Sequence, residues 1–435
     1  MARKLFGTDG VRGVAGERLT AALALALGRA AAEQAPATRP QVLIVRDTRE
    51  SGEMLESALA AGVTAAGGDV LLGGVLPTPA APLLIGQYGF DLAAVVSASH
   101  NPYHDNGIKF FAGDGFKLSD DDEHAIEARL EAGFGVRTDV GRVRALHGTQ
   151  EDYLRALHVR FDALDLTGLD VLLDCANGAT YRVGPEIFRR LGASVTTLGT
   201  EPDGCNINDG VGSTHIDALA QAVVAGGHDL GFAFDGDGDR VLAVDRRGAV
   251  VDGDELIALA ALHLRAAHRL TGDGVVVTVM TNYGFHGAMR DAGVEVVTAN
   301  VGDRYVLEQL RARGWTLGGE QSGHIIDMGF VPTGDGIASA LLTLEALAGA
   351  DLADRSAMRK LPQTLVNVRV ADKERAMAAV AEAADAENAA LEGRGRVLVR
   401  PSGTEQLVRV MVEAPSAEEC DAVCGRLTGI VESAR

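Results

Sequence analysis

The sequence predicts an α/β protein of four domains, three with mixed α/β sheets and a smaller α+β domain at the C-terminal end. Three observations lead to this prediction. Strand-like and helix-like segments alternate through most of the 435 residues, which is typical of parallel or mixed sheets covered by helices. A strand–loop–strand segment of one kind occurs three times. The composition changes after residue 366, and a chain of this length exceeds one ordinary core.

The alternation begins with an apolar, β-branched strand at 41–45. A helix follows, which we expect Ser51 to cap and the glycine pair at 67–68 to end, and a second strand follows the helix. The same order of strand, helix and strand recurs at 170–199 and at 274–299. We therefore expect three α/β domains.

Each expected α/β domain also contains an apolar strand that leads into a polar, glycine-containing loop and then into a second strand. The three segments lie at 92–111, 230–245 and 315–331. An alanine-rich acidic helix at 372–391, two strands within 397–413 and a final helix make up the last domain. The predicted domains are 1–150, 151–252, 253–365 and 366–435.

The formal net charge of −20 disfavours nucleic acid and anionic membrane surfaces as partners, because the field of the whole protein repels polyanions. A small phosphate ligand is not excluded, since it responds mainly to charges within a Debye length. Four cysteines in so long a chain do not form a disulfide framework, and we expect them to be reduced.

The apolar stretch at 20–28 is as short as a signal-peptide core, but Leu19, Leu23 and Leu27 are spaced to line one face of an amphipathic helix. No apolar run reaches the length that a membrane-spanning helix needs. We therefore expect a cytoplasmic protein whose partners are small molecules. The oligomeric state stays open.

Asp235, Asp237 and Asp239 alternate with glycines in the stretch FDGDGDR, between two apolar strands. Carboxylates this close repel one another unless a cation lies among them, and oxygen ligands favour Mg²⁺, Mn²⁺ or Ca²⁺. An EF-hand loop is excluded, because Arg240 and Arg246 occupy its glycine and acidic positions. A solvated acidic turn is the alternative, and three aspartates favour the metal site.

The stretch RPSGTEQLVR offers two guanidinium groups, two hydroxyls and free backbone amides, which together suit a phosphate group. Its candidate ligands are Arg400, Ser402, Gly403, Thr404 and Arg409. The alternative is an ordinary hairpin turn.

Two further loops are weaker signals. Glu320, Ser322 and His324 of GGEQSGH could bind sugar hydroxyls, bind phosphate or move a proton, although an ordinary surface loop is the simpler interpretation. Arg12 lies in the glycine-rich stretch FGTDGVRG, which alone could be a plain turn.

Ser99 lies in SASHNP, between two apolar segments. The chain has no GxSxG elbow and no GxxxxGK[ST] phosphate loop, and the adjacent position of His100 rarely suits a serine–histidine pair. A turn before Asn101-Pro102 is the alternative. Beside an aspartate metal loop and Lys109 on the next strand, Ser99 is a candidate carrier of a phosphoryl group.

Taken together, these motifs resemble the α-D-phosphohexomutase superfamily along essentially the whole chain. The resemblance rests on KLFGTDGVRG, RDTRESG, SASHNP, FDGDGDR, VGDRYV, GGEQSGH, TGDGI and RPSGTEQLVRVMVE, in this order. It implies four domains around a central cleft. It also implies that Ser99 is a phosphoserine and that Ser99, Asp235, Asp237 and Asp239 hold one Mg²⁺.

The remaining site residues are also implied by the resemblance. The catalytic candidates are Ser99, Arg12, His100, Lys109, Arg240 and His324. The substrate-binding candidates are Gly302, Asp303, Glu320, Ser322, Arg400, Ser402, Gly403, Thr404 and Arg409.

The reaction implied is interconversion of glucosamine 6-phosphate and glucosamine 1-phosphate through a sugar 1,6-bisphosphate, which also serves as activator. The nearest alternative is action on glucose or mannose phosphates within the same superfamily. A sugar-phosphate-binding regulator without catalysis is the alternative from another class, but binding alone does not require a nucleophile such as Ser99.

Overall fold

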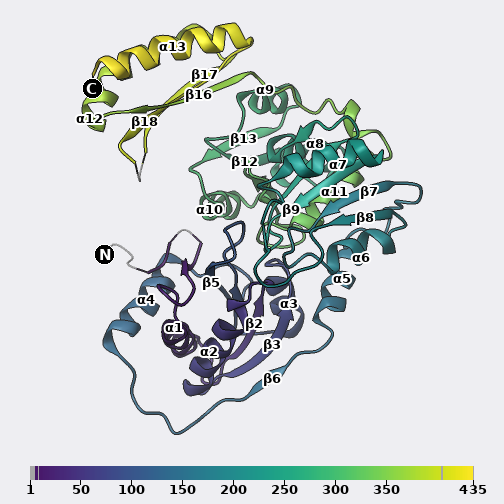
Figure 1. The fold of residues 1–435 in the computed structure, drawn as a ribbon, viewed down its shortest axis with the longest axis vertical. Coiled ribbons are helices and arrows are strands. Elements are labelled where there is room, and N and C mark those ends of the chain that lie inside the picture. Colours follow the sequence, from purple (N-terminus) through teal and green to yellow (C-terminus); the bar gives the residue numbers. More distant parts are fainter. Residues whose placement is uncertain (1–4, 8, 403–404, 435) are drawn as a thin grey trace. The chain divides into compact units, whose positions relative to one another are not determined.

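The computed structural model describes residues 5–7, 9–402 and 405–434 (Figure 1). Within these residues the chain forms two compact units. The first comprises the described residues of Met1–Val279 together with Val297–Arg355. The second comprises Met280–Val296 together with the described residues of Ser356–Arg435.

The N-terminal sheet has six strands in the order β1-β5-β4-β2-β3-β6. Its strands are β1 (Val11–Val14), β2 (Gln41–Arg46), β3 (Asp69–Val75), β4 (Leu92–Val96), β5 (Asp105–Ala112) and β6 (Val143–Ala145). The helices α1 (Ala21–Gln34), α2 (Ser51–Ala65) and α4 (Asp120–Ala132) contribute to one core with this sheet, and α3 (Ala80–Tyr88) lies against β2 and β4. Every residue of β4 is buried, which explains its continuous apolar sequence.

Two more sheets complete the α/β part of the chain. The second has the order β11-β10-β9-β7-β8 and the third β13-β12-β14-β15. Their strands are β7 (Asp170–Asp174), β8 (Ser194–Leu198), β9 (Leu230–Phe234), β10 (Val241–Asp245), β11 (Val250–Val251), β12 (Gly274–Thr278), β13 (Glu295–Ala299), β14 (Leu317–Gly319) and β15 (Ile325–Asp327). The associated helices are α5 (Thr149–Arg160), α6 (Val183–Arg190), α7 (Ile216–Gly226), α8 (Gly253–Ala266), α9 (Tyr283–Asp291), α10 (Asp303–Arg313) and α11 (Gly336–Leu347).

The three repeated segments of the sequence are antiparallel strand pairs, one in each sheet: β4 with β5, β9 with β10, and β14 with β15. In each pair a short loop connects the two strands. The same topology in three sheets confirms that the sequence repetition reflects three units of one kind.

The C-terminal part of the second unit is a three-stranded antiparallel sheet in the order β16-β18-β17. Its elements are β16 (Gln363–Arg369), α12 (Lys373–Leu391), β17 (Arg396–Pro401), β18 (Leu407–Glu413) and α13 (Ala417–Ser433). Both helices share one apolar core with the sheet. The predicted combination of three α/β sheets and a small α+β domain is confirmed, whereas the exact domain boundaries stay a prediction.

Several smaller expectations were also tested. Residues 21–28 are part of α1, which Thr20 caps and in which Leu27 is buried, whereas Leu19 is buried just before the helix begins and does not lie on its face. All four cysteines are free. The prediction that Ser51 caps α2 is wrong: Ser51 is the first helical residue, and its hydroxyl accepts a hydrogen bond from Asn106 instead. Among the described helices, none combines the length and apolarity that crossing a membrane would take.

Candidate active site

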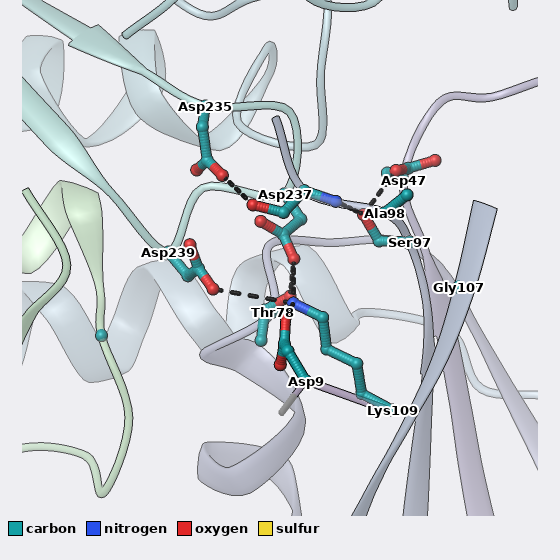
Figure 2. A network of polar contacts seen from close by, with 12 residues as sticks. Asp9, Asp47, Thr78, Ser97, Ala98, Gly107, Lys109, Asp235, Asp237 and Asp239 are labelled. Atoms are coloured by element: carbon teal, nitrogen blue, oxygen red, sulfur yellow. Dashed lines mark hydrogen bonds and ion pairs between the residues drawn. The ribbon is translucent and has the colours of Figure 1, made fainter. Parts of the chain in front are cut away.

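Three aspartates in the loop between β9 and β10 form the centre of the site (Figure 2). Asp235, Asp237 and Asp239 are buried, and each offers a carboxylate oxygen within 4.8 Å of the other two. One oxygen of Asp237 and one of Asp239 are buried without a hydrogen-bond partner among the described residues. Burial and the two neighbouring carboxylates raise the pKa of Asp235 well above its usual value. An all-oxygen donor set with unsatisfied acceptors fits a divalent cation such as Mg²⁺.

Ser99 lies just beyond the buried end of β4, with its side chain against this triad. Its Oγ donates a hydrogen bond to Oδ2 of Asp235 at 2.5 Å. The backbone of Ser99 has a φ of 54°, in the left-handed region that residues other than glycine rarely adopt. The sequence placed these four residues in two separate loops, and the structure brings them together.

Lys109 reaches the same cluster from β5. Its Nζ lies 2.8 Å from Asp237, 3.0 Å from Asp9 and 3.6 Å from Asp239. Burial alone would lower the pKa of Lys109, but Asp237, Asp9 and Asp239 together raise it well above its ordinary value. The ammonium group therefore stays charged, and it supplies positive charge rather than a site that accepts a proton.

Two arginines lie close to the triad and the Ser99 loop. Arg12 on β1 forms an ion pair with Asp9, and its Nη1 donates to the carbonyl of Ala98 at 3.4 Å. The backbone N–H of Arg240 donates to Asp235 at 3.2 Å, and the guanidinium Nε lies 3.8 Å from Asp239. Both guanidinium groups interact electrostatically with aspartates of the triad.

His100 is closer to Ser99 than adjacency in the sequence indicated, with Nδ1 3.3 Å from Oγ of Ser99. Burial, Arg240 and Arg12 lower the pKa of His100 to about 4. The imidazole is therefore neutral near pH 7 and can accept a proton.

A ring of six side chains extends from the triad toward α10, and we call it the charge ring. Its members, in order of contact, are Asp9, Lys109, Asp239, His324, Asp303 and Lys117. His324 lies 3.6 Å from Asp239 and 3.8 Å from Asp303. Burial lowers the pKa of His324, but Asp239 and Asp303 outweigh it and the net shift is upward. The backbone N–H of Gly334 donates to Nε2 of His324 at 3.2 Å, and the charges of the five other members alternate in sign from Asp303 to Asp239.

In the predicted sugar-binding loop between β14 and β15, only some of the predicted residues contact other predicted site residues. Oε1 of Glu320 accepts a hydrogen bond from the backbone of Gly302 at 2.9 Å, which joins two of the predicted positions. Ser322 is exposed.

The predicted phosphate loop belongs to the second unit, where it follows β17. Arg400 and Arg409 are cross-strand neighbours on β17 and β18. Burial and the charge of Arg409 lower the pKa of Arg400, and Nε of Arg409 is buried without a hydrogen-bond partner among the described residues. Ser402 accepts a hydrogen bond from the backbone of Glu405. Gly403 and Thr404 lie outside the described residues.

With this geometry established, comparison with known proteins identifies the family. Sequence models of the four domains of phosphoglucomutase/phosphomannomutase match in order: domain I to residues 3–135, domain II to 151–248, domain III to 252–365 and the C-terminal domain to 365–429. The chain belongs to the phosphoglucomutase/phosphomannomutase family. The resemblance stated from its motifs is confirmed.

Individual members of the family agree with this assignment. The chain is 51% identical to phosphoglucosamine mutase of Mycolicibacterium paratuberculosis, over 99% of this chain and 100% of that protein. A phosphoglucomutase/phosphomannomutase family protein of Burkholderia thailandensis is 26% identical with a TM-score of 0.83, and the match covers 99% and 96% of the two chains. N-acetylphosphoglucosamine mutase of Aspergillus fumigatus, solved with GlcNAc-6P and magnesium, shares the fold at 18% identity with a TM-score of 0.70, over 99% and 96% of the chains.

Sequence reasoning missed several residues of this phosphohexomutase site. Asp9 lies in the stretch FGTDGVRG, whose pattern does not indicate a role for it, and Lys117 follows a glycine-containing turn. Thr78 donates a hydrogen bond to Asp237 at 2.7 Å. A lone threonine between two prolines and a lone lysine have no distinctive pattern, so no sequence signal would have found Thr78 or Lys117.

Proposed function

We propose that the protein interconverts glucosamine 6-phosphate and glucosamine 1-phosphate, with Ser99 as the carrier of the phosphoryl group. The observation that carries this proposal is the placement of Ser99 Oγ against Asp235, within a buried triad of aspartates and beside charged Lys109. A merely binding protein has no need of a buried nucleophile at a metal-type site. The choice of glucosamine is supported by the relatives that are about half identical over the full length.

The first half of the reaction moves the phosphoryl group from Ser99 to the sugar. The bond between phosphorus and Oγ of Ser99 breaks, and a bond from phosphorus to the free sugar hydroxyl oxygen forms. The product is glucosamine 1,6-bisphosphate. In the second half, the bisphosphate presents its other phosphate, whose phosphorus–oxygen bond to the sugar breaks as the bond to Oγ of Ser99 forms again.

Each half-reaction also moves one proton. In the first half the proton of the attacking sugar hydroxyl passes to the leaving Oγ of Ser99, and we assign its relay to His100, whose Nδ1 lies 3.3 Å from that Oγ. In the second half the same proton passes from Oγ of Ser99, as it attacks phosphorus, to the sugar oxygen that leaves. Lys109 cannot take this role, because three carboxylates hold its ammonium group in the charged form.

The chain's own groups lower the barrier mainly by positioning and by charge. Asp235, Asp237 and Asp239 would hold Mg²⁺, which supplies positive charge to the phosphoryl oxygens when bound. Lys109 and Arg12 add positive charge from β5 and β1. Glu320 and Ser322 are proposed to bind sugar hydroxyls. We assign Arg400, Ser402, Gly403, Thr404 and Arg409 to the phosphate that is not transferred.

The supporting assignments follow from the same proposal. A sugar 1,6-bisphosphate serves as activator by loading Ser99, and one Mg²⁺ is held per site. We place the reaction in the cytoplasm, and we propose small hexosamine phosphates as the partners of the protein.

The test combines intact-mass measurement with steady-state rates. After incubation with glucosamine 1,6-bisphosphate and Mg²⁺, the protein should gain the mass of one phosphoryl group, and the Ser99→Ala variant should not. Turnover of glucosamine 6-phosphate should exceed that of glucose and mannose 6-phosphates. No mass gain on Ser99 would overturn the covalent route, and preference for a neutral sugar would move the protein to the glucose or mannose branch.

A further inference from the structure

Arg49 belongs to the RDTRESG motif, to which the proposed reaction gives no role, yet it is among the largest fully buried side chains. We infer that Arg49 and Asn208 form a clamp that positions Ser99 by holding the backbone carbonyls of its loop. This inference rests on the proposed role of Ser99. It assigns two positioning residues, neither of which is expected to touch the substrate.

The guanidinium group of Arg49 is fully used by the Ser99 loop and by Asp47. Its Nε donates to Asp47 at 2.8 Å. Its Nη2 donates to the carbonyls of Ser99 at 2.9 Å and Asn101 at 2.8 Å. Its Nη1 donates to the carbonyl of Asp105 at 2.9 Å and to that of Pro102. One side chain therefore binds four carbonyls, three in the Ser99 loop and one at the first residue of β5.

Asn208 holds two of the same carbonyls from a different part of the chain. Its Nδ2 donates to Ser99 O at 2.9 Å and to Asn101 O at 3.0 Å. Arg49 lies between β2 and α2 of the first sheet, whereas Asn208 lies between β8 and α7 of the second. The clamp thus joins the loop that carries the nucleophile to the domain that carries the aspartate triad.

The amide side of Ser99 is fixed as well. Its N–H donates to Oγ of Ser97 at 3.0 Å, and that hydroxyl donates to Asp47 at 2.5 Å. Asp47 is the carboxylate that pairs with Arg49. The carbonyl of Ser99 therefore bonds directly, and its N–H through Ser97, to one buried ion pair. Converging carbonyl dipoles repel one another, and a positive guanidinium among them relieves that repulsion.

This arrangement explains how Ser99 stays in its left-handed conformation, which a serine does not favour by itself. The triad loop also packs closely against this carbonyl: a Cβ added at Gly236 would lie 2.6 Å from Ser99 O and 2.8 Å from Nδ2 of Asn208. Without the clamp, the loop would be free to relax and Oγ would turn away from Asp235. The clamp should therefore affect kcat and leave KM unchanged.

The experiment uses two clamp variants in the full-length protein. Asn208→Gly removes the amide donor, preserves the backbone φ of 58°, and leaves no buried charge unpaired. Arg49→Lys keeps the charge but cannot form five hydrogen bonds. Asn388→Ala is the matched control, because Asn388 also bridges backbone groups, but at Val397, far along the chain from Ser99.

We expect kcat of Asn208→Gly to fall about 10- to 100-fold with KM within about twofold, since small misplacement of a reacting atom has effects of this size. The kcat of Arg49→Lys should fall further, and the kcat of Asn388→Ala should match that of the wild type. Hydrogen exchange of the amides at 97–107 should accelerate in both clamp variants. That readout needs no turnover, so it tests the clamp even if the proposed reaction is wrong.

Two results would overturn the clamp. One is a folded Asn208→Gly variant with wild-type kcat and unchanged exchange at 97–107. The other is a rise in KM without a fall in kcat, which would make Asn208 a substrate-binding residue. Failure of the proposed function looks different: the wild type itself would neither turn over glucosamine 6-phosphate nor take phosphate on Ser99.

Discussion

At the scale of single residues, the chemistry depends on charges that are buried and unequally compensated. Asp237 accepts hydrogen bonds from the charged ammonium group of Lys109 and from the hydroxyl of Thr78. Asp235 accepts them from two neutral groups, the hydroxyl of Ser99 and the backbone N–H of Arg240. Negative charge is therefore disfavoured most strongly at Asp235, whose pKa is raised by burial and by its two carboxylate neighbours. A divalent cation would reverse that penalty.

We predict that Mg²⁺ stabilises the protein against urea, by about 2.7 kcal/mol at a concentration of 100 times Kd. The Asp235→Asn variant should lose this gain, and without metal it should be at least as stable as the wild type because one disfavoured charge is gone. Urea unfolding with EDTA or with MgCl₂, at ionic strength matched by KCl, measures both effects. Equal stabilisation of the variant would argue against Asp235 as a ligand.

At the scale of elements, the site depends on loops held by the strands and helices at their ends. The antiparallel pairs β4–β5 and β9–β10 place Ser99 and the triad at strand ends, where the flanking residues are buried. Helix α11 begins within the TGDGI motif, and Asp335 caps it by accepting a hydrogen bond from the N–H of Ala338. The hydroxyl of Tyr153 lies 3.0 Å from both oxygens of this buried carboxylate.

Asp335 makes the stability of the protein depend on pH. Burial raises its pKa to about 7, although the Ala338 N–H and Tyr153 lower it. Because the folded pKa lies above the unfolded value of about 3.9, this group's contribution to stability is complete below about pH 4 and is lost as pH rises through 7. The loss amounts to about 4 kcal/mol at most.

The Asp335→Asn variant should remove this dependence, since asparagine also caps helices but does not ionise. We expect its stability relative to the wild type to increase between pH 4 and 8, as measured by urea unfolding at each pH. A constant difference between the two proteins over that range would show that Asp335 is ionised in the folded state throughout.

At the scale of the whole molecule, the first unit is held together at the site by charges from all three of its sheets. The charge ring joins Asp9 and Lys109 of the first sheet's domain to Asp239 of the second and to Asp303 of the third. Arg304, next to Asp303, also forms ion pairs with Glu123 and Asp120 of α4. Asp303, a candidate substrate-binding residue, therefore also contributes to domain packing.

Lys117→Met should lower the free energy of unfolding by about 3–5 kcal/mol, because it leaves Asp9 and Asp303 short of a buried partner. The exposed pair Arg39–Asp69 provides the control, and Arg39→Ala should change stability little. Urea unfolding of both variants measures the difference. Similar losses for the two would show that the ring contributes no more than a surface pair.

The sequence by itself determined the fold class and the chemical character of the loops. The informative patterns are local: alternating strands and helices, three strand–loop–strand segments and the Asp-Gly repeat. In the structure these segments form the three α/β sheets, and the three aspartates of the repeat lie together. The resemblance carried by those motifs led to the right family. Local patterns could do this because strand periodicity and ligand spacing are set within a few neighbouring residues.

Only the tertiary structure decided which side chains hold the nucleophile and the carboxylates in place. Arg49, Thr78, Lys117 and Asn208 act on residues that lie 50 to 186 positions away in the sequence. Such contacts depend on how sheets pack against one another. A single arginine, threonine, lysine or asparagine is not part of a sequence pattern that indicates its partner. The sequence therefore indicated the candidate reacting groups, and the packing of the first unit determined which residues position them.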